Sequence, residues 1–128
     1  MLFGLPLRTI RAPRIFHVLK VKATDTFRAR AARLLAAEER EALYAFLADN
    51  PTAGDIVGGT GGVRKLRWRM AGRGTRGGAR VLQLYLRHVD TVWLLEVYGK
   101  RENADLSPAD VKAIKAAVAI IKQAERLR

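Results

Sequence analysis

The sequence contains no cysteine, only two histidines, and no hydrophobic run long enough to cross a membrane. Without cysteine the chain can form neither disulfides nor thiolate metal sites, and this fits a reducing cytoplasm. His17 and His88 have no second histidine or paired carboxylate at the spacing of metal ligands. We therefore expect a cytoplasmic protein with no bound metal, no cofactor and no membrane partner.

Acidic residues are absent between Asp55 and Asp90, where eight basic residues gather. They are Arg64, Lys65, Arg67, Arg69, Arg73, Arg76, Arg80 and Arg87. The 128 residues carry a formal charge of +12, and glycines on both sides of residues 63–71 would let a ligand approach the backbone closely. Because lysine and arginine neutralise phosphates, this block predicts a surface that binds nucleic acid or another polyanion. The alternative is a basic, solvated surface with no ligand.

Hydrophobic spacing predicts one α+β domain in the order β-α-α-β-β-β-α. We expect a strand over residues 15–22, a helical hairpin over 26–36 and 38–49, and strands over 63–70, 79–88 and 91–99. Loops are expected over 52–62 and 71–78. Ser107, Pro108 and Asp110 are typical of a helix start, so a C-terminal helix follows. Its expected buried stripe is Val111, Ile114, Val118 and Ile121. The sheet should be small and mainly antiparallel, packed on the hairpin and the C-terminal helix.

Strand alternation groups the side chains that could do chemistry. Lys65, Arg67 and Arg69 should share one face of their strand, and Leu66 and Trp68 the other. Tyr98 should share a face with Glu96 and Lys100, although an edge tyrosine among solvated charges would give the same spacing. Both tryptophans are expected in the core. Residues 72–77 match G-x-G-x-x-G, but a strand follows instead of a helix, so no nucleotide cofactor is expected.

Six short segments, taken in order, form one recognisable pattern. They are residues 50–57 (NPTAGDIV), 59–68 (GTGGVRKLRW), 72–74 (GRG), 77–81 (GGARV), 98–102 (YGKRE) and 105–107 (DLS). Together they resemble the HigB-like branch of the RelE/ParE toxins, the toxic halves of bacterial type II toxin–antitoxin pairs. The resemblance covers about residues 15–125. It suggests a basic N-terminal arm over residues 1–14, followed by a toxin domain over 15–128.

The resemblance implies a ribosome-dependent endoribonuclease that cuts mRNA in the decoding site. In such enzymes a ribose 2′-OH attacks the adjacent phosphate and the 5′-oxygen leaves, without a metal ion. The implied partners are a cognate antitoxin protein, the ribosome and mRNA, with no small-molecule cofactor. Two other functions share these features: a ParE-like toxin that inhibits DNA gyrase without catalysis, and a non-toxic basic module that binds RNA or ribosomes. The basic strand face favours the nuclease.

The resemblance also implies roles for individual residues. Lys65 and Arg67 match a basic pair on one strand, Arg80 matches the arginine that opens the next strand, and Arg101 matches the basic residue after the last strand. Arg67 and Arg80 would hold the scissile phosphate with planar guanidinium groups, and Lys65 would transfer a proton. RelE proper has a tyrosine near the start of its C-terminal helix, where this chain has about Ser107, and Tyr98 is the nearest substitute. The expected RNA-binding residues are Arg64, Arg69, Arg73, Arg76 and Lys100.

Overall fold

The computed structural model describes residues 19–70, 74–99 and 105–126. The expected arm over residues 1–14 lies outside these ranges, and so do residues 15–18 of the expected first strand. The elements in chain order are β1 (Lys20–Ala23), α3 (Asp25–Leu34), α4 (Ala37–Asp49), β2 (Asp55–Ile56), β3 (Arg64–Met70), β4 (Gly74–Leu86), the 3₁₀ turn η1 (Arg87–Val89), β5 (Thr91–Gly99) and α5 (Pro108–Arg126).

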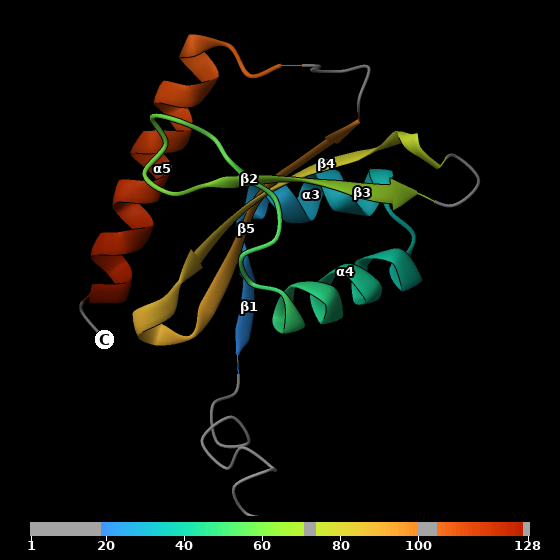
Figure 1. Cartoon of the computed structure of the whole chain (residues 1–128), viewed down its shortest axis with the longest axis horizontal. Coiled ribbons are helices and arrows are strands. Elements are labelled where there is room, and N and C mark those ends of the chain that lie inside the picture. The colour runs from blue at the N-terminus through green and yellow to red at the C-terminus, as the bar shows by residue number, and fades with distance from the viewer. Residues whose placement is uncertain (1–18, 71–73, 100–104, 127–128) are drawn as a thin grey trace, which may run out of the picture.

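These strands form one mixed sheet in the order β1-β5-β4-β3-β2. β1 runs parallel to β5, and the other neighbouring pairs are antiparallel. The helical hairpin of α3 and α4 lies on one side of the sheet and α5 on the other (Figure 1). The predicted α+β class, helical hairpin, mainly antiparallel sheet and C-terminal helix are confirmed.

Several predicted boundaries were wrong. Part of the loop expected over residues 52–62 is strand β2, which pairs with the start of β3. β4 begins at Gly74, inside the loop expected over 71–78, because Gly74 already pairs with Met70 of β3. The strand expected over 79–88 ends at Leu86, where η1 and the left-handed Asp90 (φ 46°) make the turn into β5. Pairing with a long neighbouring strand therefore overrides the local preference of glycine for loops.

The break inside the helical hairpin has a cap that the sequence pattern did not suggest. Thr24 starts α3 by accepting a hydrogen bond from the Phe27 N–H (3.0 Å). Between the helices, the Glu39 carboxylate accepts from the Ala36 N–H (2.7 Å), and Arg40 Nη1 donates to the Leu35 carbonyl (2.8 Å). These contacts satisfy backbone groups that both helix ends leave unpaired.

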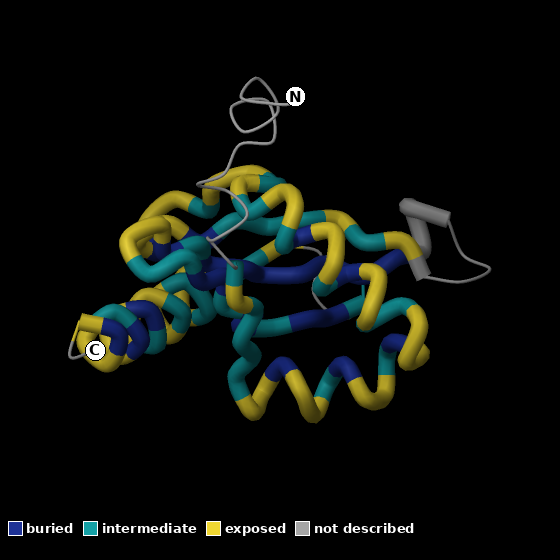
Figure 2. The backbone as a smooth tube through the Cα atoms, turned by 90° about the horizontal axis from the view of Figure 1, so that it is seen from below, coloured by how far each residue is buried: buried dark blue, intermediate teal, exposed yellow. Residues whose placement is uncertain are grey.

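Two hydrophobic layers sandwich the sheet. On the hairpin face, Phe27, Leu43 and Leu47 pack against alternate residues of β4 and β5. On the face that carries α5, called the α5 face below, the buried cluster comprises Val63, Leu82, Leu84, Leu86, Leu95, Tyr98, Val118 and Ile121. The tube view shows buried segments running through the strands between the helices (Figure 2). Val111, Ile114 and both tryptophans are only partly buried.

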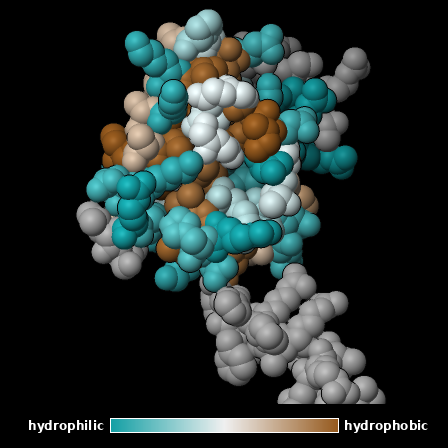
Figure 3. All heavy atoms as spheres, turned by 60° about the vertical axis from the view of Figure 1, so that its left-hand side comes forward, coloured by the Kyte–Doolittle hydropathy of each residue, from teal (hydrophilic) through white to brown (hydrophobic). Residues whose placement is uncertain are grey.

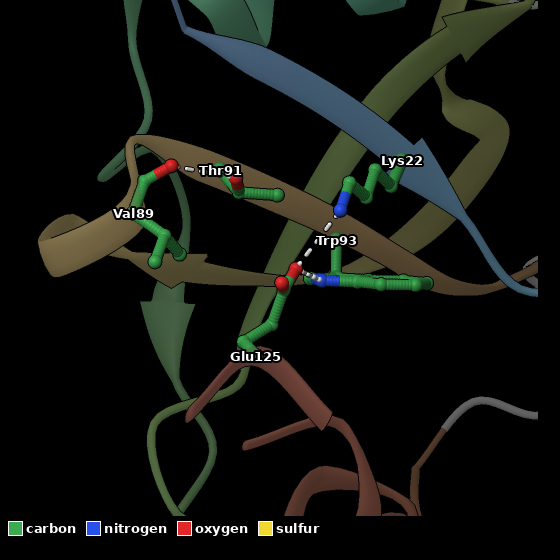
Figure 4. Close-up of polar contacts among 5 residues, drawn as sticks. All are labelled: Lys22, Val89, Thr91, Trp93 and Glu125. Carbon is green, nitrogen blue, oxygen red and sulfur yellow. Dashed lines mark hydrogen bonds and ion pairs between the residues drawn. The ribbon is translucent and has the colours of Figure 1, made fainter. Parts of the chain in front are cut away.

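A buried ion pair anchors the C-terminal half of α5. Glu125, with a side chain 2% exposed, accepts hydrogen bonds from Lys22 Nζ (3.2 Å) and Trp93 Nε1 (2.9 Å). Lys22 Nζ also lies 5.6 Å from the centre of the Trp93 ring. Figure 4 shows the three side chains converging from β1, β5 and α5. The helix is therefore fixed to two adjacent parallel strands by one carboxylate.

The glycine-rich loop before β3 packs on α5. Gly59 and Gly61 have positive φ angles, and a Cβ added to Gly61 would lie 3.3 Å from a methyl group of Val118. Lys122 Nζ donates to the Gly61 carbonyl (2.9 Å), and Thr60 is buried. In the sequence these glycines suggested close approach of a polyanion. In the structure they allow the loop to approach the helix.

Gly54 positions the first residues of β3. Its φ is 98°, and an added Cβ would lie 2.8 Å from the carbonyl oxygen of Lys65. The Gly54 carbonyl in turn accepts a hydrogen bond from Arg64 Nη1 (3.0 Å). Buried Gln83 donates to the carbonyls of Pro51 and Ala53 (2.8 and 3.0 Å), which holds the same loop against β4.

We expect Gly54→Ala to lower the free energy of unfolding by ~1–3 kcal/mol, because alanine is strained at this φ and its methyl group meets the β3 backbone. Gly58→Ala is the matched control, since an added Cβ there has nothing within 4 Å and the φ is not positive. Urea denaturation monitored by tryptophan fluorescence measures both variants. Equal stability of the two variants would contradict this role for Gly54.

Lys22→Met should lower the free energy of unfolding by ~2 kcal/mol, because it removes the cation beside a buried carboxylate. Adding Glu125→Gln should recover much of that loss, since the amide oxygen still accepts from Trp93 without carrying a charge. A double-mutant cycle from urea denaturation measures this coupling. Additive effects of the two substitutions would show that the pair does not anchor α5.

Candidate anion-binding site

Strand register brings the candidate residues from three strands into one row. Arg67 of β3 lies opposite Arg80 of β4, and Arg80 lies opposite Tyr98 of β5. In the neighbouring row, Lys65 lies opposite Leu82, and Leu82 opposite Glu96. Because directly paired residues point to the same side of a sheet, both rows belong to one face. Leu82 and Tyr98 pack in the cluster that contains α5 residues, so this is the α5 face.

Arg80 is a buried cation. It is 7% exposed, and within the described residues its Nη1 atom has no hydrogen-bond partner. The residue paired with it on β3 is a second arginine, and like charges directly opposite each other destabilise a sheet. A buried charge is costly unless it is paired. An anion between Arg67 and Arg80 would offset both costs, so the arrangement is suited to a phosphate.

Tyr98 is a buried hydroxyl group beside this cation. Its residue is 2% exposed, and its hydroxyl has no partner among the residues that the structure describes. Burial raises the pKa of Tyr98 above 10.0; Arg80 lowers it, and Glu96, Asp105 and Asp110 raise it further. Tyr98 therefore remains protonated at neutral pH and can donate a hydrogen bond. Tyr98 does lie where β5 has no β1 neighbour, but it is buried in the cluster that contains α5 residues, so the alternative of a tyrosine among solvated charges is wrong.

A cleft of about 280 Å³ opens beside Tyr98, between the sheet and the N-terminal half of α5. It is lined by Arg30, Leu82, Glu96, Tyr98, Leu106, Asp110, Ala113 and Ile114. Arg30 comes from α3, on the opposite side of the sheet, and its Nε lies 3.0 Å from Glu96 Oε1. β1 pairs with β5 only as far as Leu94, so the edge of β5 is open at Glu96 and the arginine can reach around it.

Ser107 has a structural role in this chain. Its hydroxyl accepts a hydrogen bond from the Asp110 N–H (3.1 Å), and its own N–H donates to Asp110 Oδ2 (2.9 Å). This reciprocal pair is a capping box, which confirms the predicted start of α5. Ser107 therefore caps the helix, at the place where RelE proper is expected to have a tyrosine.

The other predicted site residues fall into three groups. Lys65 is partly buried on the α5 face, and Arg67 and Arg69 are exposed. Arg64 alternates to the hairpin face and bonds to Gly54, so it holds the loop, and its contact with RNA stays a prediction. Outside the described residues lie Arg73, Lys100, Arg101 and the side chain of Arg76. Arg80 does not open its strand, as the resemblance implied, because β4 begins six residues earlier.

Sequence patterns missed the walls of the cleft. No sequence pattern singled out Arg30 or Leu82. Only the packing of α3 against the edge of β5 places Arg30 beside Glu96. Glu96 was recognised as sharing a face with Tyr98, but nothing in the spacing indicated an ion pair.

The described residues contain no group of three histidine, aspartate or glutamate side chains that could hold a metal ion. Within the same ranges, no helix is long and apolar enough to cross a membrane. The space-filling view shows the side of the molecule with α5, where hydrophobic residues reach the surface among hydrophilic ones (Figure 3). Ile120, which is 71% exposed, is the most exposed large hydrophobic residue in the described part of the chain.

No family model matches the sequence. Among solved structures, this chain is similar to the E. coli toxin RelE in the free state. That structure is of a mutant in which two arginines are replaced by alanine. The TM-score is 0.53 and the sequence identity is 12%, over 78% of this chain and 96% of that chain. The fold is therefore RelE-like. This agrees with the fold that the sequence resemblance implied. At 12% sequence identity, the structural similarity supports a shared fold and says nothing about activity.

If Arg80 binds an anion, Arg80→Met should leave the free energy of unfolding nearly unchanged or raise it slightly, since the substitution removes a buried charge. The same variant should lose most of the rise in melting temperature that inorganic phosphate causes in the unmodified protein. Arg28→Met, which removes an exposed cation from α3, should keep that rise. Differential scanning calorimetry with and without phosphate makes the comparison. An equal phosphate response in both variants would rule out Arg80 as the anion ligand.

Proposed function

We propose that this protein is the toxin of a type II toxin–antitoxin pair and acts as a ribosome-dependent endoribonuclease. One observation carries the proposal: a buried arginine with an unpartnered Nη1 lies between a second arginine and a protonated tyrosine, within the described part of a RelE-like sheet. A phosphodiester supplies the negative charge that this row lacks. The sequence resemblance to the HigB-like branch supports RNA as the source of that phosphodiester.

In the proposed reaction, Arg67 and Arg80 bind the non-bridging oxygens of the scissile phosphate. Negative charge on these oxygens grows as the 2′-oxygen approaches phosphorus, and guanidinium donors placed there stabilise the transition state more than the ground state. The buried position of Arg80 strengthens this effect, because water screens the charge less. Arg67 is exposed and can join the site from the solvent side.

Two proton transfers complete the chemistry. The P–O2′ bond forms while the P–O5′ bond breaks, leaving a 2′,3′-cyclic phosphate and a 5′-hydroxyl group. Lys65, one row from Arg67 on the same face, takes the proton of the 2′-hydroxyl in its neutral amine form and becomes an ammonium group. Tyr98 supplies a proton to the leaving 5′-oxygen, a role that fits a phenol whose raised pKa keeps it protonated at neutral pH. Arg101 is proposed to assist at the same phosphate.

The remaining cations are proposed to hold RNA backbone around the site. Arg69 extends the exposed basic face of β3 beyond Arg67. Arg73, Arg76 and Lys100 are proposed to contact mRNA and ribosomal RNA phosphates. A cytoplasmic protein with a charge of +12 needs a partner that shields its basic face when it is not on the ribosome. We propose that an acidic or amphipathic segment of the antitoxin lies across the basic face and provides it.

Arg67→Ala and Arg80→Ala should each slow mRNA cleavage on programmed ribosomes by about a hundredfold or more, since a donor aimed at developing charge contributes ~3 kcal/mol. Arg33→Ala, an exposed cation on α3 away from the α5 face, should cleave at the unmodified rate. Single-turnover cleavage with mapped 5′ ends is the measurement.

Three outcomes would go against this function. Near-normal rates for both arginine variants would rule out the site. Intact mRNA accompanied by gyrase-linked DNA breaks would indicate a ParE-like inhibitor. Ribosome binding with neither cleavage nor growth arrest would indicate a non-toxic RNA-binding module.

A further inference from the structure

The cleft beside Tyr98 differs in charge from the rest of the site. Glu96 and Asp110 both line it, whereas the sequence has no acidic residue between Asp55 and Asp90. Carboxylates accept hydrogen bonds and repel phosphate. The cleft is therefore unsuited to the anion that Arg67 and Arg80 would hold, although Tyr98 borders both places. It is suited to an uncharged group that donates hydrogen bonds.

The walls of the cleft are suited to a flat ring. Leu82 lies on the sheet side, and Leu106, Ala113 and Ile114 lie on the α5 side. Apolar side chains on two opposite sides cover the faces of a ring and leave its edge to the polar groups. In a polynucleotide, the group that is flat, uncharged and attached one sugar away from a phosphate is the base.

The polar groups of the cleft favour guanine over uracil. Arg30 and Glu96 are held side by side by their 3.0 Å contact, so they present a donor next to an acceptor. The Watson–Crick edge of guanine has an acceptor, O6, next to two donors, N1–H and N2–H. Uracil has a single donor between two carbonyl oxygens, and a carboxylate repels both of these oxygens. Asp110 is already used in the capping box, so its main effect here is to add negative charge.

We propose that this cleft is a nucleobase pocket that recognises guanine next to the scissile phosphate. Glu96 accepts from N1–H and N2–H, Arg30 donates to O6, and Leu82 and Ile114 enclose the ring. Glu96 and Arg30 are then specificity residues, separate from the residues that hold the phosphate. The inference rests on the proposed function for its biological meaning, whereas nucleotide binding to the cleft can be tested without it.

The binding experiment uses the full chain and guanosine or uridine 3′-monophosphate, followed by NMR of methyl groups. The guanine nucleotide should shift the methyl signals of Leu82, Leu106 and Ile114 and bind at least about tenfold more tightly than the uridine nucleotide. Glu96→Gln should remove most of that preference, because an amide has one acceptor oxygen and one NH₂ donor group and cannot accept from both guanine donors. Glu38→Gln, an exposed carboxylate on α4, should keep it.

Ala113→Trp is a second variant that does not depend on the ion pair. Ala113 is exposed at the cleft on α5, so a large ring there should block entry of either base without disturbing the core. Loss of binding in this variant, with an unchanged melting temperature, supports the pocket. Equal affinity for both nucleotides, or methyl shifts confined to residues outside the cleft, would overturn the proposal.

The cleavage experiment separates this inference from the proposed function. If the chain cuts mRNA, mapped ends from the unmodified protein should favour guanine at one position beside the cut, and Glu96→Gln should flatten that bias while cleavage continues. The same base bias in both proteins would overturn the pocket and leave the nuclease intact. Guanine-selective binding without any cleavage would support the pocket and overturn the proposed nuclease.

Discussion

The antiparallel pairing of β3, β4 and β5 is the constraint on which the site depends. It sets Arg67, Arg80 and Tyr98 in one row although they lie far apart in the sequence. A slip of one residue in either pairing would turn the side chains of the slipped strand to the opposite face of the sheet and break up the row. The hydrophobic layers on both faces therefore fix the register, and the register fixes the site.

Two buried charges in this molecule show how stability and function differ. Glu125 is buried with a lysine and an indole N–H as partners, and it fastens α5 to the sheet. Arg80 is nearly as buried, yet Nη1 has no partner among the described residues and the cross-strand neighbour is another cation. Evolution commonly tolerates such a cost at a site whose ligand completes it. The contrast is the physical basis for proposing that the row binds an anion.

Helix α5 divides the sheet face that it covers into a closed part and a part with a cleft. Its C-terminal half is held down by Glu125, while its N-terminal half stands away from β5 and leaves a cleft. The glycine-rich loop supports this arrangement by packing against the middle of the helix. As a result, a basic row and a cleft with two carboxylates lie next to each other, and they suit different parts of one nucleotide.

The sequence by itself determined the element order apart from the short strand β2, the C-terminal helix and the two faces of β3, because these follow from local periodicity and capping. It also showed a block of eight basic residues without an acidic one, within which the family resemblance indicated Lys65, Arg67 and Arg80. Tertiary structure alone decided that Arg80 is buried, that Arg64 turns away to hold Gly54, and that Arg30 reaches Glu96 around a sheet edge. Burial and cross-strand partners depend on contacts between residues distant in the chain, and spacing along a sequence carries no record of those contacts.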